Sequence, residues 1–123
     1  MSQLFFLLGS ISGGLAVALG AFGAHALKAR LTSDPLTTFE TGVRYQMYHA
    51  LAMLAVVVAI TRWPVSNLPN MAGWLFVAGT LLFSGSLYLL CFTHQRWWGA
   101  VTPFGGLALI AGWACLALAA LGG

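Results

Sequence analysis

The segment between Arg44 and Arg62 constrains this chain most, because its apolar run is too short to cross a bilayer. Residues 50–60 (ALAMLAVVVAI) are uninterrupted apolar residues and form only about 16 Å of helix at about 1.5 Å per residue. A bilayer core is about 30 Å thick and needs about 20 residues. If the segment spans, the missing length comes from residues 43–49 (VRYQMYH). The sequence therefore predicts polar side chains inside the membrane, where ionisable groups commonly mark functional sites.

Composition assigns the chain to the membrane proteins. Of 123 residues, 60% are hydrophobic and 6% are charged, whereas soluble domains carry about 25% charged residues. No basic patch is large enough to suit a nucleic acid. Four apolar stretches predict an all-α, integral membrane four-helix bundle, with residues 1–123 as a single transmembrane domain. The expected helices cover residues 4–26, 36–61, 71–92 and 101–121.

The basic residues predict how the bundle is oriented. With four spans, loops 1 and 3 (residues 27–42 and 93–100) lie on one side, and both termini lie on the other. The termini side has only Arg62, whereas cytoplasmic loops carry an excess of Lys and Arg. We therefore expect loops 1 and 3 in the cytoplasm and both termini outside. The basic residues in or beside these two loops are Lys28, Arg30, Arg44 and Arg96.

The second helix is expected to begin in the cytoplasm and to run on into the membrane. Thr37 and Glu40 match a capping box, with Thr37 as the N-cap and Glu40 at N3. Asp34 before Pro35 offers an alternative start three residues earlier. An open alternative is that this helix only dips into the membrane, which would place the termini on opposite sides.

Polar residues in the first turns of this helix form two neighbouring groups. Glu40, Arg44 and Tyr48 share one stripe at i, i+4 and i+8, and Tyr45 and His49 form an adjacent i, i+4 pair. In one interpretation the stripe is an interfacial anchor, in which the Arg head reaches the surface and the tyrosines lie among the headgroups. In the other interpretation it lines a polar binding pocket.

Candidate residues on the other helices favour the pocket interpretation. His25, His49 and His94 are all expected at the cytoplasmic end of the bundle. Helix 4 is expected to start at Thr102-Pro103, with a good N-cap residue followed by a proline at N1. Its free N–H groups would suit an anion or a carbonyl oxygen. The candidate binding residues are His25, Glu40, Arg44, Tyr45, Gln46, Tyr48, His49, Ser84, Ser86, Tyr88 and Thr102.

Small residues predict close packing between the helices. Gly9 and Gly13 have the small-xxx-small spacing in helix 1, as do Ala108 and Gly112 in helix 4. Such faces allow membrane helices to approach closely without a hydrophobic driving force. They serve packing within the bundle, and they are also compatible with a homo-oligomer.

Four ordered motifs resemble an uncharacterised family of small four-helix membrane proteins, the bacterial YgdD type and the transmembrane-protein-256-like proteins. The motifs are GAFGAHAL (20–27), TGVRYQMYHALA (41–52), LFSGSLYLL (82–90) and VTPFGGLALIAGW (101–113). The resemblance covers nearly the whole chain. It implies a multi-pass protein of the bacterial inner (plasma) membrane, which makes the outer side the periplasm. It implies no established activity, substrate or cofactor.

Three function hypotheses follow. The first is a non-enzymatic binding or interaction protein, whose pocket at the cytoplasmic leaflet takes a lipid headgroup, a quinone or a protein partner. The second is a small channel or a proton- or ion-coupled transporter, possible as an oligomer, with His25, His49 and Tyr45 as relay residues. The third, a metal or haem site at His25 and His49, lacks further ligands, so no metal or cofactor is expected. An enzyme is disfavoured because Ser84 and Ser86 have no evident base.

Overall fold

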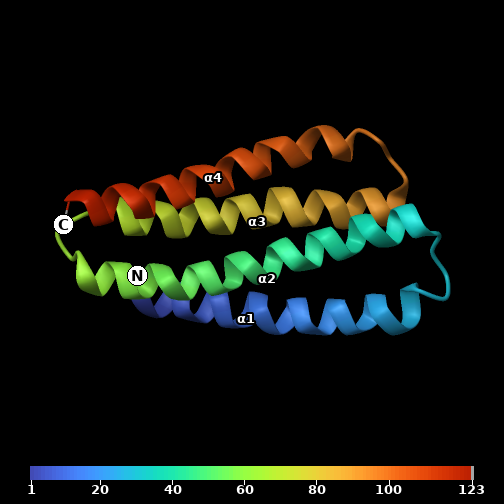
Figure 1. Cartoon of the computed structure of the whole chain (residues 1–123), viewed down its shortest axis with the longest axis horizontal. Helices are drawn as coiled ribbons and strands as arrows, with labels where there is room; N and C mark the ends of the chain where they lie inside the picture. Colours follow the sequence, from blue (N-terminus) through green and yellow to red (C-terminus); the bar gives the residue numbers. More distant parts are fainter. Residues whose placement is uncertain (123) are drawn as a thin grey trace.

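The computed structural model describes residues 1–122 as four long helices (Figure 1). All four are long and apolar enough to cross a membrane. The expected all-α membrane bundle is therefore confirmed, and each helix extends slightly beyond the range predicted from the sequence. In chain order the helices are α1 (Ser2–Phe22) with a π-helical continuation η1 (Gly23–Leu27), α2 (Ser33–Arg62), α3 (Leu68–Thr93) and α4 (Trp98–Gly122).

Helix α2 runs without interruption through the whole segment that the sequence marked as too polar to span easily. It begins at Ser33, with Thr32 as its N-cap in an extended conformation, so the capping box at Thr37 is not used. Pro35 lies in the first turn, where a missing N–H group costs no helical hydrogen bond. The polar half and the apolar half of α2 thus form one continuous helix that is long and apolar enough to cross a membrane.

The predicted start of helix 4 at Thr102 is wrong, because α4 begins one turn earlier at Trp98. Pro103 consequently lies inside the helix. The additional turn is supported by Trp97 and Trp98, whose rings stack with their centroids 3.9 Å apart. Thr102 does not cap the helix, and an anion site built on the N-terminus of a helix at this residue is not formed.

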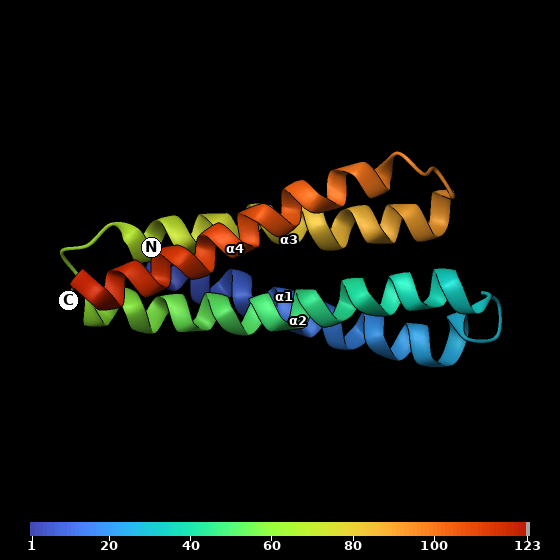
Figure 2. The ribbon, with the colours of Figure 1, turned by 45° about the horizontal axis from the view of Figure 1, so that its top comes forward.

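The helices form two antiparallel hairpins, α1–α2 and α3–α4, which are joined through α2 and α3 (Figures 1 and 2). Helix α4 packs along α3 but touches α2 at few places. Figure 2 shows that α4 is inclined to the other helices, so that its first turns stand away from α2. Both termini lie at the same end of the bundle (Figure 1).

Two apolar clusters fill the bundle. The larger one contains Phe5, Val56, Phe76 and Leu109, so it draws on all four helices. The smaller one lies towards the loop 1 and loop 3 end, where Leu27, Phe39 and Cys91 pack together. The rest of the apolar surface faces outward, as the bilayer requires of a spanning helix.

Glycines set how closely the helices approach each other. A Cβ atom on Gly105 would overlap the backbone of Phe83, so α3 and α4 are in backbone contact there. A Cβ atom on Gly9 would lie 2.9 Å from the carbonyl oxygen of Ala50. The backbones of α1 and α2 therefore also approach each other closely at this glycine. Gly14, by contrast, has open space around it. The packing glycines therefore act within the chain, as small residues do between membrane helices.

We expect Gly105→Ala to lower the free energy of unfolding by about 1–3 kcal/mol, because the added methyl group forces α3 and α4 apart. Thermal unfolding in detergent micelles measures this change. Gly14→Ala is the matched control, and it should be neutral or stabilising by up to about 1 kcal/mol, since alanine is the better helix former. Equal destabilisation by both substitutions would contradict the close α3–α4 contact.

Candidate functional site

Gln46 joins three helices in the middle of the bundle. Its Nε2 atom donates a hydrogen bond to the backbone carbonyl of Ser12 on α1, at 2.9 Å. Its Oε1 atom accepts a hydrogen bond from the Tyr88 hydroxyl on α3, at 2.6 Å. Ser84 adds a second link, since its Oγ atom donates to the carbonyl of Gly42 at 2.7 Å. These contacts connect α2 to α1 on one side and to α3 on the other.

His49 provides the polar link between α2 and α4. The Trp113 indole N–H donates to His49 Nε2 at 3.0 Å, and His49 Nδ1 lies 2.8 Å from the backbone carbonyl of Tyr45. An indole nitrogen can only donate, so Nε2 is the unprotonated nitrogen and Nδ1 carries the hydrogen. Both ring nitrogens are thereby engaged, and His49 is a neutral structural side chain in this arrangement.

A third polar contact connects α3 and α4. The hydroxyl groups of Ser86 and Thr102 lie 2.6 Å apart, and Ser86 Oγ also lies 2.9 Å from the carbonyl of Phe83. Ser86 is buried, so its hydroxyl would be costly without these partners. Both candidate residues therefore serve helix packing here, and neither is directed at a helix-terminal anion site.

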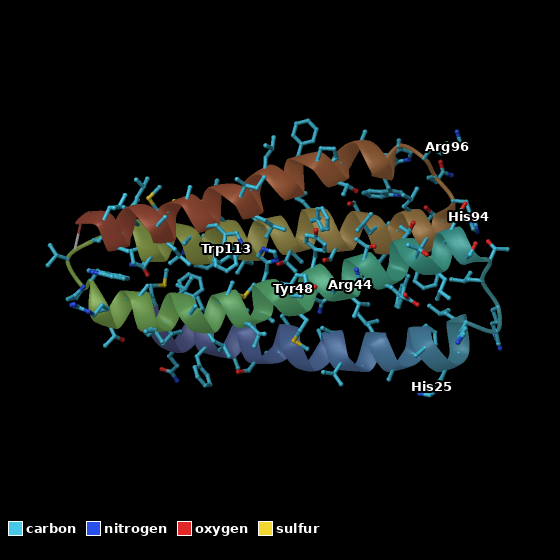
Figure 3. All side chains as sticks on the ribbon, viewed as in Figure 1. His25, Arg44, Tyr48, His94, Arg96 and Trp113 are labelled. Atoms are coloured by element: carbon cyan, nitrogen blue, oxygen red, sulfur yellow. The ribbon has the colours of Figure 1, made fainter. Side chains whose placement is uncertain are left out.

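The remaining candidates lie on the surface of the bundle. His25 in η1, Glu40 and Arg44 are exposed, and Tyr48 is 50% exposed. Figure 3 shows His25 and His94 at the loop end, whereas Trp113, the partner of His49, lies further along the bundle. The expectation that all three histidines share one end is therefore wrong. It failed because helical periodicity gives the face of a residue but not its depth.

Tyr45 belongs to an aromatic group rather than to a polar pocket. Its ring packs against Phe83 on α3, with 4.8 Å between the centroids, and is stacked near His49 at 6.4 Å. His49 in turn contacts Phe76 and Trp113. The structure thus distributes the predicted site residues over four helix interfaces, an exposed stripe on α2, and η1. It does not bring all of them together in one pocket.

A groove of about 350 Å³ lies between α1 and α3, with α2 beneath it. Gln46 and Met53 of α2 are buried, whereas Ile11, Leu15 and Leu81 line the groove and are more than half exposed. The groove therefore opens on the surface of the bundle, which faces hydrocarbon when the helices span a membrane. Three of the predicted site residues line it: Gln46, Ser84 and Tyr88.

Other cavities contain fewer of the predicted residues. A cavity of about 440 Å³ lies at the termini end beside Arg62 and Trp63, and none of the candidate residues lines it. Another lies between the start of α2 and the end of α3, near Asp34, His94 and Arg96. Within residues 1–122, no cluster of three or more His, Cys, Asp or Glu side chains is placed to hold a metal ion.

Three residues that contribute to these contacts or to the groove were not predicted from the sequence. Ser12 acts through its backbone carbonyl, which no sequence pattern reveals. Trp113 could have been noticed, because tryptophans in spanning helices concentrate at the two interfaces and this one lies well inside the predicted helix. Thr80, which also lines the groove, is a single polar residue in the middle of an apolar span.

Four spanning helices with polar contacts between them and a groove open to lipid define a multi-pass integral membrane protein. The family described as "Protein of unknown function (DUF423)" matches residues 19–106. The chain is 44% identical over 119 residues to the UPF0382 membrane protein YwdK of Bacillus subtilis, covering 97% of both chains. It is 41% identical over 120 residues to the UPF0382 inner membrane protein YgdD of Escherichia coli, covering 98% of this chain and 91% of that protein. The chain therefore belongs to the DUF423 (UPF0382) membrane protein family, and the resemblance identified from its motifs is confirmed. No solved structure matches it significantly.

The hydrogen bond from Trp113 predicts a single tautomer of His49. In ¹⁵N NMR of protein labelled at histidine, we expect a protonated Nδ1 and an unprotonated Nε2 for this residue. Trp113→Phe should shift the Nε2 signal and cost about 0.6 kcal/mol of stability, the average for hydrogen bonds between membrane helices, and at most about 1.7 kcal/mol. Trp97→Phe is the control, since Trp97 is exposed and stacks on Trp98 instead. A protonated Nε2 in the unmodified chain would contradict the arrangement.

Proposed function

We propose that this protein is a non-enzymatic membrane protein that binds the hydrocarbon chain of a membrane lipid in the groove between α1 and α3. The observation that carries the proposal is the groove itself, which is lined by apolar side chains and open at the bundle surface. In a bilayer such a groove is in contact with lipid tails, so a hydrocarbon chain is its natural occupant.

Polar contacts beneath the groove support a preformed site. Gln46 reaches α1 through Ser12 and α3 through Tyr88, so one side chain sets the spacing of both walls. A site whose shape is fixed before binding avoids the entropic cost of ordering it. The ligand would then meet a groove of defined width, which is the basis for selecting one lipid over the bulk.

The same contacts favour binding over catalysis. The hydroxyl groups of Ser84 and Tyr88 both donate to acceptors within the chain, to Gly42 and Gln46 respectively. A nucleophile or general acid needs a free reactive group and a positioned partner. The polar residues are divided among separate helix interfaces, and this arrangement favours binding over a channel or a carrier.

The groove is tested by filling it. Gly85 lines the groove, and a Cβ atom built on it meets nothing within 4 Å. Gly85→Leu should therefore occupy the groove without disturbing helix packing. The protein is extracted in mild detergent and examined by native mass spectrometry. We expect the lipid bound to this variant to fall by a factor of about ten or more, equivalent to about 1.4 kcal/mol of binding free energy.

Gly14→Leu is the matched control for this experiment. A Cβ atom on Gly14 likewise meets nothing within 4 Å, but Gly14 lies outside the residues that line the groove. This variant should retain lipid as the unmodified chain does. Equal retention by Gly85→Leu would refute binding in the groove, and equal loss in both variants would point to a general effect of added bulk.

We further propose that the protein lies in a bacterial inner membrane with loops 1 and 3 in the cytoplasm. The name of the Escherichia coli relative supports the inner membrane, and the excess of Lys and Arg beside these loops supports the orientation. In intact spheroplasts, Ser2→Cys should react with a membrane-impermeant maleimide, whereas Ser33→Cys should react only after lysis. The reverse pattern would invert the topology.

A further inference from the structure

Thr80 lacks the hydroxyl hydrogen bond that five other helical threonines of this chain make. Its Oγ1 atom is buried and has no hydrogen-bond partner within the described chain. A threonine in a helix usually bonds the carbonyl one turn earlier. Five threonines of this chain do so with the carbonyl four residues before them: Thr38, Thr41, Thr61, Thr93 and Thr102.

The position of Thr80 makes the missing partner significant. It lies midway along α3, about 18–20 Å from either end at about 1.5 Å per residue. No water is available at that depth, so an unsatisfied polar group is costly. The Oδ1 atom of Asn70 also lacks a partner, but Asn70 lies in the first turn of α3, where water and headgroups are within reach.

Thr80 also lines the groove, so its side chain lies beside the space that the proposed ligand occupies. Threonine has two favourable χ1 rotamers in a helix, so its hydroxyl can turn from the groove wall towards a bound molecule. We infer that Thr80 donates a hydrogen bond to a carbonyl group of the ligand. This inference rests on the proposed function and narrows its ligand to a neutral lipid of the quinone class.

Depth separates this class from ordinary phospholipids. The edge of the hydrocarbon core lies about 15 Å from the midplane, since the core is about 30 Å thick. A phospholipid with its headgroup at the surface keeps its ester carbonyls near that edge, so they do not reach Thr80. A quinone carries carbonyl groups without any charge, and it can enter the membrane interior with both its ring and its tail.

The remaining hydrogen-bonding capacity of the groove matches such a ligand. Gln46 uses one of the two Nε2 hydrogens in its bond to Ser12, which leaves a second donor on a residue that lines the same groove. Thr80 supplies the other donor. A quinone ring presents two carbonyl acceptors, and the apolar walls suit its isoprenoid tail. The two donors on the protein therefore match the two hydrogen-bond acceptors on the ligand.

The test uses the full chain in phosphatidylcholine nanodiscs and a short-tailed quinone labelled with ¹³C at its carbonyl carbons. The unmodified protein should bind the quinone and should show a carbonyl infrared band shifted to lower frequency by the hydrogen bond. Thr80→Val keeps the shape but removes one donor, so the band of the carbonyl that Thr80 bonds should return to the unshifted frequency while that of the other carbonyl stays shifted. This variant should bind the quinone about fivefold to tenfold more weakly. Thr80→Ser should keep both properties.

The variants separate this inference from the proposed function. If Gly85→Leu releases the quinone but Thr80→Val changes neither affinity nor the infrared band, the inference fails and the groove remains. If Gly85→Leu releases phospholipid while the unmodified chain binds no quinone, the inference also fails. If Gly85→Leu changes the retention of neither lipid, both proposals fail. If native mass spectrometry shows a dimer that Gly85→Leu makes monomeric, a second copy occupies the groove and both proposals fail.

Discussion

The bundle depends on one constraint, which is that polar groups in a bilayer must find their partners within the protein. The uninterrupted apolar run of α2 covers only residues 50–60, and Gln46 and His49 lie in the middle of the helix. Gln46 is satisfied by α1 and α3, and His49 is satisfied by Trp113 on α4. The polarity of α2 thus connects it to every other helix, where lipid tails provide no hydrophobic driving force for association.

The same hydrogen bonds explain why a groove exists beside such close packing. Gly9 and Gly105 bring each hairpin together at backbone contact. Between the hairpins, Gln46 bonds Ser12 on α1 and Tyr88 on α3, and the groove lies open between these two helices. At Gly85 a side chain is absent altogether. The two closely packed hairpins are therefore joined by hydrogen bonds, and the groove between α1 and α3 remains open on the lipid-facing surface.

The four helices could be predicted because apolar length is a strong signal in a membrane protein, and the structure confirms all of them. The start of α4 could not, since Thr102-Pro103 carries a good local capping signal that tertiary contacts override. Thr102 instead meets Ser86 on α3, and the stacked Trp97 and Trp98 support the extra turn. The depth of His49 was missed for a related reason, because it depends on where α2 packs against α3 and α4.

The candidate site was predicted only in part, because the sequence does not show which polar side chains have a hydrogen-bond partner on another helix. The sequence shows that a polar side chain is in the membrane, but only the structure shows whether another helix satisfies it. His49 attracted attention as an ionisable group, yet Trp113 and the Tyr45 carbonyl complete its hydrogen bonds. Thr80 is neutral and inconspicuous, yet its hydroxyl has no partner in the described chain. In a medium without water, the group that lacks a partner is the stronger indication of a ligand. The functional interpretation therefore moves from the histidine to the threonine.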